Sequence, residues 1–333
     1  MKTSSILLVC YVSSAIGLGH LTRLLALAQA IKKVSSIQIE LLIFGDLIER
    51  DELSNFNITF LSLSDEFDSS VKQTIEALNP AVVVFDLCPK LLPDNLIVLF
   101  TWLKNKDTKL VSIDSLIDFC HVLDLVWVPS FYFDFKDVPA CVGKIKSGWD
   151  SFLIQKRLPS QVWQKGMRVL VLTGGSDVTN LGSTLPKQLD ALLNDQVEVN
   201  WVRGPYAKAP LLPDNTRLKW NIHNAPNQLD ELIVQSNYVL TVFGVSFFEV
   251  LQYGIPTVVF SPYDDKDNEE LIALAEEQVA VVEKNSDTAV PALKNLMQNT
   301  DLAKSISQKA LSKLSVNGAH LLAESVLSIA EIR

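Results

Sequence analysis

The sequence contains few cysteines, and they form no pattern that binds metal. Cys10, Cys88, Cys120 and Cys141 are the only four among 333 residues, with neither a C-x-x-C pair nor a histidine at zinc-ligand spacing. We therefore predict four reduced thiols in the core of a cytoplasmic protein.

Long hydrophobic runs are also missing. The first apolar stretch, residues 6–12, is followed by Ser13 and Ser14, so it is too short for a transmembrane helix and poorly shaped for a signal peptide. No later stretch reaches about 18 uninterrupted apolar residues, the length that a membrane span requires. The sequence predicts no transmembrane segment and a cytoplasmic location.

Positive charge is scarce. Lys and Arg total 29 against 38 Asp and Glu, which gives a net charge of −9, whereas binding to nucleic acid requires a basic face. We therefore expect no nucleic-acid partner, although a local site can still bind a small anion. The motifs G-x-S-x-G, H-E-x-x-H and G-K-[ST] do not occur, so serine hydrolase, zinc peptidase and kinase functions lose their usual support.

The chain does contain two similar halves. With 48% hydrophobic residues it can bury large cores, and its length suits two domains. Apolar runs of strand length alternate with helical patterns, which is typical of parallel sheets covered on both faces. The expected strands are residues 6–12, 39–44, 81–85, 110–113 and 125–128, and then 169–172, 197–202, 239–243, 257–260 and 279–282.

These patterns predict an α/β protein of two Rossmann-like domains. We place the N-terminal domain at residues 1–145 and a linker at 146–165, where aromatic, Pro and Gly residues show no sustained period. The C-terminal domain then extends over 166–333 and includes the helical patterns of the tail.

The first expected strand leads through SSAIGLGHLTR, residues 13–23, into an apolar helix. Gly17 and Gly19 permit close approach of a ligand, and the helix N-terminus offers unpaired N–H groups to an anion. His20 falls in the first helical turn, where the helix dipole favours a neutral ring that can act as a general base. Arg23 shares its helix face and would meet a ligand charge or a surface acid. The alternative is a tight turn with a partly buried histidine.

The strand at 169–172 leads into TGGSD, residues 173–177. The backbone N–H groups of Gly174 and Gly175 and the hydroxyl of Ser176 form a candidate phosphate cradle. A plain glycine turn is the alternative, but the position matches that of the His20 turn in the other half.

The segment FGVSFFE, residues 243–249, follows a further strand. It places Ser246 and Glu249 near the carboxyl edge of the sheet, where open α/β sheets bind ligands. A carboxylate there can hold both hydroxyls of a ribose, and the alternative is an acid that complements the helix dipole.

The acidic run YDDKDNEE, residues 263–270, contains the pattern Asp265-x-Asp267, which superficially fits a divalent metal. The run follows a late strand, and Asp267 is a good helix N-cap residue. We therefore expect a cap and a solvated loop here, and no metal.

Together these motifs resemble those of the UDP-sugar hydrolases of the pseudaminic acid pathway, along nearly the whole chain. Residues 14–23 are similar to the hydrolase signature G-x-G-H-x-x-R, and residues 174–181 to G-G-[ST]-D-x-x-N-L. The resemblance implies that His20 activates water against the anomeric carbon and that Asn268 matches a functional asparagine if a one-residue gap is allowed. Residues 86–88 are DLC where the hydrolases have Asp-His-Tyr, a departure in the hydrolase's own pocket.

Residues 246–267 are instead similar to the C-terminal signature of the N-acetylglucosaminyl transferases that make lipid II. That resemblance assigns the ribose of UDP to Glu249 and places Ser246 and Asp267 in the nucleotide-sugar site. Both resemblances imply the GT-B architecture, in which two Rossmann-like domains face a cleft.

We predict an inverting, metal-independent glycosyltransferase of cell-surface or secreted glycan biosynthesis, without a cofactor. Its partners are a sugar acceptor and a nucleotide-sugar donor, which the resemblance implies is UDP-linked. UDP-sugar hydrolysis, with water as the acceptor, is the near alternative. A non-catalytic nucleotide-sugar-binding protein is a further one. An NAD-dependent dehydrogenase would use Gly17, Gly19 and Asp46, but Thr22 occupies the place of its third glycine.

Overall fold

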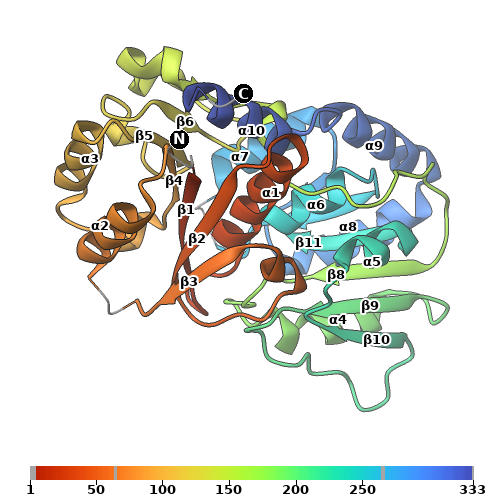
Figure 1. The fold of residues 1–333 in the computed structure, drawn as a ribbon. Coiled ribbons are helices and arrows are strands. Elements are labelled where there is room, and N and C mark those ends of the chain that lie inside the picture. The colour runs from red at the N-terminus through yellow and green to blue at the C-terminus, as the bar shows by residue number, and fades with distance from the viewer. Residues whose placement is uncertain (1–4, 64–65, 264–266, 332–333) are drawn as a thin grey trace. The chain divides into compact units, whose positions relative to one another are not determined.

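The computed structural model describes residues 5–63, 66–263 and 267–331, and the chain forms two compact units. One unit contains the chain up to Ile154 and again from Val316, and the other extends from Gln155 to Ser315. Figure 1 shows their strands and helices. The division falls inside the segment predicted as the linker.

The sheet of the N-terminal unit is entirely parallel, in the order β3-β2-β1-β4-β5-β6-β7. All residues of the central strands β1 and β4 are buried, because helices cover both faces of the sheet. The strands are β1 (Ser5–Val12), β2 (Gln38–Gly45), β3 (Asn57–Leu61), β4 (Val82–Asp86), β5 (Lys109–Ile113), β6 (Leu125–Trp127) and β7 (Ile145–Lys146).

Alternate residues of β1 enter two separate cores. Ile6 and Leu8 pack with α1 (Gly19–Val34) and α10 (Gly318–Ile329), whereas Leu7 and Val9 pack with α2 (Phe67–Leu78) and α3 (Leu96–Asn105). Successive side chains of a strand point to opposite faces, so α1 and α10 cover one face of this sheet and α2 and α3 the other (Figure 1).

The second unit repeats this plan with a parallel sheet in the order β10-β9-β8-β11-β12-β13. Its strands are β8 (Arg168–Leu172), β9 (Glu198–Arg203), β10 (Lys219–Asn224), β11 (Tyr238–Val242), β12 (Thr257–Phe260) and β13 (Val281–Glu283). Its helices are α4 (Leu185–Leu192), α5 (Leu229–Gln235), α6 (Val245–Leu251), α7 (Asn268–Glu277), α8 (Ser286–Gln298) and α9 (Thr300–Lys313).

The strand order of each sheet locates its candidate ligand site. In both sheets the first strand is central: the next two strands are added on one side of it and the later strands on the other side. The strand order therefore reverses between β1 and β4 in the first sheet and between β8 and β11 in the second. Open α/β sheets bind ligands beyond the carboxyl ends of the strands at this switch point. A ligand site is therefore expected at the loops after these four strands.

All ten predicted strands occur, with bounds that shift by at most two residues. Three strands were not predicted from the sequence, and all three lie at edges of the sheets: β3, β7 and β10. β3 and β10 alternate polar and apolar residues and are only half-buried, so they lack the continuous apolar run that marks a central strand.

The last helix belongs to a different unit from the one predicted. We assigned residues up to 333 to the second domain, but α10 packs in the first, where Leu322 and Val326 are fully buried in the core that contains α1. At the start of the helix, a Cβ on Gly318 would lie 2.5 Å from the carbonyl oxygen of Phe152. The buried apolar face of α10 and the close approach of Gly318 to Phe152 therefore both place this helix in the N-terminal unit.

The cysteines also differ from the prediction. We expected four reduced thiols, but Cys120 and Cys141 form a disulfide, whereas Cys10 and Cys88 are free. Lys144 Nζ donates to the carbonyl oxygen of Cys120 at 3.1 Å and to that of Leu123 at 2.8 Å, and so fixes the same turn. The two partners are 21 residues apart, Cys141 in a short 3-10 helix and Cys120 in a turn, and no sequence pattern indicates their contact.

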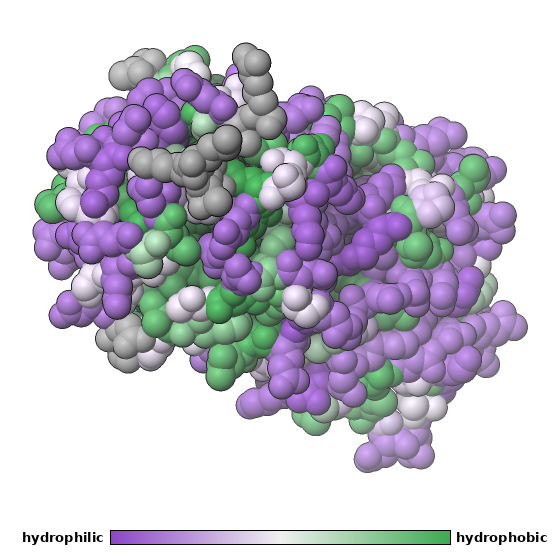
Figure 2. Space-filling model, viewed as in Figure 1, coloured by the Kyte–Doolittle hydropathy of each residue, from purple (hydrophilic) through white to green (hydrophobic). Residues whose placement is uncertain are grey.

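Hydrophilic side chains predominate on the face that Figure 2 shows, and hydrophobic ones gather in smaller areas between them. Among the helices in the described part of the chain, none is both long and apolar enough to span a bilayer.

Candidate active site

The loop between β1 and α1 is a tight turn. The N–H of Gly17 donates to the carbonyl oxygen of Ser13 at 2.8 Å, and Gly17 has a φ of 84°, a left-handed conformation that favours glycine. No side chain caps the N-terminus of α1, which begins at Gly19 and carries His20 as its second residue. The turn therefore brings His20 to the carboxyl edge of the sheet.

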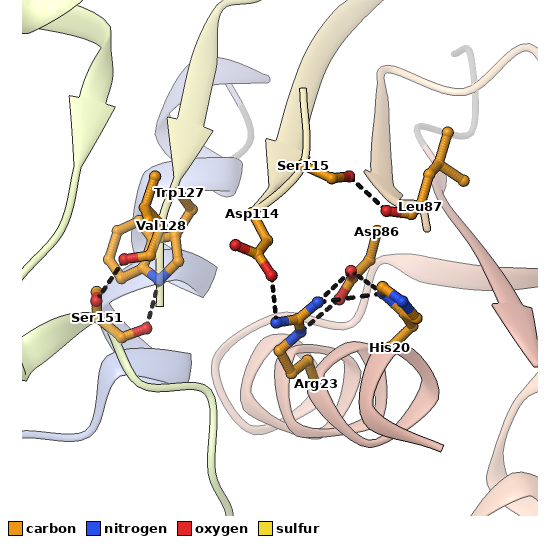
Figure 3. A network of polar contacts seen from close by, with 9 residues as sticks. All are labelled: His20, Arg23, Asp86, Leu87, Asp114, Ser115, Trp127, Val128 and Ser151. Atoms are coloured by element: carbon orange, nitrogen blue, oxygen red, sulfur yellow. Dashed lines mark hydrogen bonds and ion pairs between the residues drawn. The ribbon is translucent and has the colours of Figure 1, made fainter. Parts of the chain in front are cut away.

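His20 meets an aspartate from the neighbouring strand. Its Nδ1 lies 2.6 Å from Oδ1 of Asp86, the last residue of β4, whose side chain is 0% exposed (Figure 3). β1 and β4 are the two strands that flank the switch point, so the pair occupies the place where this fold binds ligands.

Arg23, one turn further along α1, links two carboxylates. Its Nε and Nη2 donate to Oδ2 and Oδ1 of Asp86 at 2.9 and 2.7 Å, and its Nη1 donates to Oδ2 of Asp114 at 2.9 Å. Figure 3 shows the guanidinium between the two acids, with His20 on the far side of Asp86. The fork geometry is the one in which arginine binds a carboxylate most strongly.

The charges in this cluster fix the protonation of Asp86. Burial alone would raise the pKa of Asp86, but the positive charge of Arg23 and the hydrogen bonds from Arg23 and His20 outweigh it and hold the pKa below its ordinary value. Burial likewise opposes the charge of Arg23, yet the carboxylates of Asp86 and Asp114 raise the pKa of its guanidinium. Asp86 is therefore an anion that can only accept hydrogen bonds.

An ionised Asp86 determines the tautomer of His20. Nδ1 must donate to the carboxylate, so the approach of Arg23 Nη2 to Nδ1, at 3.1 Å, is a contact between two donors rather than a hydrogen bond. Within the described residues each hydrogen-bond contact of the ring involves Nδ1. A neutral ring consequently has its lone pair on Nε2, which can take a proton from a bound hydroxyl group or water.

Asp114 and the next residue are tied to the same edge of the sheet. Asp114 follows β5 with a φ of 71°, unusual for a residue other than glycine, and its N–H donates to the carbonyl oxygen of Trp127 at 2.8 Å. Ser115 Oγ donates to the carbonyl oxygen of Leu87 at 2.5 Å, which joins the loops after β5 and β4 (Figure 3). The bond to Trp127 fixes the backbone of Asp114, whose carboxylate is half exposed and contacts Arg23.

In the second unit, the loop after β8 contains the predicted phosphate cradle. Gly174 has a φ of 85°, and both it and Ser176 are partly exposed. Thr173 Oγ1 is buried at the end of β8 and has no hydrogen-bond partner within the described residues, so it is a donor left over for a ligand. Asp177 accepts from the N–H groups of Leu181 and Gly182, both at 2.8 Å, and so holds the loop rather than a ligand.

A second loop lies directly against the cradle. A Cβ on Gly204, which follows β9, would lie 2.3 Å from the carbonyl oxygen of Gly175, and the N–H of Tyr206 donates to that oxygen at 3.1 Å. Arg203 Nε donates to the carbonyl oxygen of Ala207 at 2.7 Å, which fixes the side chain at the end of the strand beside β8. This places one cation at the carboxyl edge next to the glycine loop.

The other predicted residues of this unit follow β11 and β12. Ser246 and Glu249 lie partly buried in α6, one strand from the glycine loop across the switch point. Asp267 holds the N-cap position of α7, but its carboxylate accepts from Ser261 Oγ at 2.5 Å instead of capping the helix. Asn268 is the first residue of α7 and is exposed.

The acidic pattern at Asp265-x-Asp267 falls partly outside the described residues, since Asp265 is not among them. Residues 5–63, 66–263 and 267–331 contain no cluster of three or more His, Cys, Asp or Glu side chains that could hold a metal ion.

Each unit thus gathers its own candidates. The first brings together Gly17, Gly19, His20 and Arg23, and the second places Gly174, Gly175, Ser176, Ser246, Glu249, Asp267 and Asn268 at the ends of three adjacent strands. Asp86, Asp114 and Thr173 were not among the predicted site residues. Asp86 had one usable signal, since an acid that ends a fully apolar strand next to the strand of a glycine turn sits at the switch point.

No protein-family model matches the sequence, and no curated protein does either. Solved structures do resemble the fold. MurG of Acinetobacter baumannii has a TM-score of 0.64 at 13% identity, over 97% of this chain and 99% of MurG. UGT2 of Phytolacca americana, complexed with UDP-2fluoro-glucose and pterostilbene, has a TM-score of 0.67 at 14% identity, over 98% and 100%.

UDP-GlcNAc 2-epimerase of Neisseria meningitidis, bound to UDP-GlcNAc, is similar with a TM-score of 0.58 at 10% identity, over 97% of this chain and 100% of the epimerase. The two parallel sheets and these likenesses show a GT-B-like fold, as the sequence predicted. At such low identity the likeness shows the fold alone.

Proposed function

We propose that the chain is an inverting glycosyltransferase that uses a nucleotide sugar as donor and His20 as general base. The observation that carries the proposal is the contact of His20 Nδ1 with the buried, ionised Asp86. It orients the ring, supplies Nε2 as the acceptor of a proton, and stabilises the imidazolium that forms.

In the proposed reaction, Nε2 of His20 takes the proton of an acceptor hydroxyl while the hydroxyl oxygen attacks the anomeric carbon of the donor. The bond from that carbon to the diphosphate oxygen breaks, and its electron pair leaves with the nucleoside diphosphate. Attack opposite the leaving group inverts the anomeric centre. The proton stays on His20 and is lost to solvent after product release.

The second unit is proposed to hold the donor. The N–H groups of Gly174 and Gly175, with the hydroxyls of Thr173 and Ser176, are suited to a diphosphate, and Arg203 offsets part of its charge. Glu249 is assigned to the ribose, and Ser246, Asp267 and Asn268 to the remainder of the nucleotide sugar. Two proteins of this fold carry UDP-2fluoro-glucose and UDP-GlcNAc, which supports a UDP-linked donor.

Hydrolysis is the second candidate. It is supported by the likeness of residues 14–23 and 174–181 to the hydrolase signatures, and it needs only water in place of the acceptor hydroxyl. The same histidine would serve both reactions, so the acceptor is what separates them.

The test is to incubate the purified chain with UDP-, GDP- and CMP-sugars in the presence of a chelator, and to follow nucleotide and sugar products by phosphorus NMR and mass spectrometry. Nucleoside diphosphate released only when an acceptor extract is added supports transfer. Free sugar formed in water alone supports hydrolysis. No turnover of any donor under either condition contradicts the proposal.

A further inference from the structure

Four side chains of the candidate site in the first unit form a chain of contacts rather than a pair. His20 contacts Asp86, Asp86 is forked by Arg23, and Arg23 reaches Asp114. The side chains of Arg23 and Asp86 are 12% and 0% exposed, so their charges are poorly screened by water. A histidine that gains a proton here must do so inside this charge distribution.

The balance of charge shows why the fourth group matters. With Asp86 anionic and Arg23 cationic, the two cancel, and an imidazolium on His20 would leave an excess positive charge in a largely buried site, with Nδ1 only 3.1 Å from the guanidinium. Such a charge is costly to bury without a partner. The Asp114 carboxylate removes the excess, because it makes the cluster negative by one before protonation and neutral after it.

The remaining neighbours do not supply this charge. On β1, Cys10 is fully buried, and burial raises the pKa of its thiol well above the usual range, so it stays neutral. On α10, which packs against α1, His320 and Glu324 form an exposed pair of their own. In the loop after β2, Asp46 accepts from the N–H of Ser14 at 3.2 Å, whereas the carboxylates that contact His20 and Arg23 are those of Asp86 and Asp114.

We infer that Asp114 is a positioning residue that acts through Arg23 and allows His20 to take up a proton. The inference rests on the proposed role of His20 as the base, and it adds a residue that the His20–Asp86 contact alone does not require. Its geometry is prepared in advance, since Asp114 is held in a left-handed conformation by the bond from its N–H to Trp127.

The test follows the pH titration of the His20 ring by NMR in the full chain, without any substrate. The chain has four histidines, and the spectrum of His20→Asn assigns the signal. In Asp114→Asn, which keeps the shape and suits the backbone, the midpoint should move to lower pH, because one nearby negative charge is lost. Asp114→Glu should restore most of the shift.

Two matched variants separate charge from structure. Asp107→Asn makes the same change at another exposed aspartate with a positive φ in this unit, and Ser115→Ala removes the neighbouring bond to Leu87 without changing charge. Both should leave the midpoint in place. An unchanged midpoint in Asp114→Asn, or an equal shift in Ser115→Ala, overturns the inference. If Asp114→Asn does not fold, Asp114→Gly, which also suits this backbone, is judged by the same criterion.

Failure of this inference can be distinguished from failure of the proposed function by comparing the NMR titration with the pH dependence of turnover. If the inference and the function both hold, the acidic limb of the pH dependence of kcat/KM moves by the same amount as the NMR midpoint. If the midpoint moves but the pH dependence does not, Asp114 sets the charge of the cluster and the assignment of His20 as base is wrong.

Discussion

Nδ1 of His20 lies 2.6 Å from Oδ1 of Asp86, although the two residues are 66 positions apart. The contact exists because β1 and β4 are hydrogen-bonded neighbours, with Cys10 in register with Asp86, and because the turn after β1 returns α1 across the end of β4. The same two strands flank the switch point of the sheet. The candidate base is therefore placed by the topology of the unit.

We expect Asp86→Asn to lower kcat by about 10³- to 10⁴-fold, as an amide no longer fixes the tautomer or stabilises the imidazolium. The measurement is steady-state turnover of the donor found in the panel, with the Kd of the nucleotide as control. The Kd should stay unchanged, since Asp86 lies in the unit that is not assigned to the nucleotide. Full activity in this variant would contradict the role of the pair.

Removing Arg23 should destabilise the fold. Arg23→Met leaves Asp86 buried without its forked partner, and we expect the free energy of unfolding at pH 7 to fall by about 3–5 kcal/mol. Denaturant unfolding measures it. Arg50→Met, which removes an arginine with an ion pair nearer the surface, should cost about 1 kcal/mol or less, and an equal loss in both variants would argue against a special role for Arg23.

The same cluster predicts a pH dependence of stability. The folded pKa of Asp86 is lowered from its ordinary value of 3.8, so its ion pair stabilises the fold above that value and the contribution is lost as the pH falls through the folded pKa. Asp86→Asn should therefore show a shallower loss of unfolding free energy in acid than the wild-type chain. Asp107→Asn, at an exposed site, should follow the wild-type curve.

The close packing at Gly204 can be tested through nucleotide affinity. A Cβ at residue 204 would clash with the carbonyl oxygen of Gly175, at a distance of 2.3 Å. Gly204→Ala should therefore displace the glycine loop and weaken nucleotide binding by about tenfold or more. Gly143→Ala is the matched control, because a Cβ at Gly143 meets nothing within 4 Å. Calorimetry on both variants decides whether this loop holds the nucleotide.

The cysteines give a chemical test. Alkylation of the denatured chain without reductant should modify Cys10 and Cys88 only, and all four cysteines after reduction. Opening the bond between Cys120 and Cys141 should lower the free energy of unfolding by about 3 kcal/mol, as expected for a loop of this size. Alkylation of four cysteines without reductant would show that the thiols are reduced, as first predicted.

The sequence carried most of the fold because the central strands are continuous apolar runs, and burial on both faces produces that pattern. The edge strands were missed for the same reason, since β3 and β10 keep one side in water. The tail helix α10 was assigned to the wrong unit. An apolar face indicates that a helix packs against a core, but it does not indicate which of the two cores the end of the chain reaches.

The candidate site was only half accessible from the sequence. Glycine turns and a first-turn histidine are local features, so His20 and Gly174 could be singled out by their spacing. Asp86 and Asp114 could not, because their roles depend on strand order and on the reach of Arg23 between two strands. Residues 86–88 were recognised only as a departure from a known pattern, and no role was predicted for Asp86.

The most direct test of the account compares His20→Ala with His320→Ala, a change at an exposed histidine of the same unit, in turnover and in nucleotide affinity. We predict that His20→Ala lowers kcat by about 10²-fold or more while the Kd of the nucleotide is unchanged, and that His320→Ala alters neither. Retained turnover in His20→Ala would contradict the central claim that this histidine is the base.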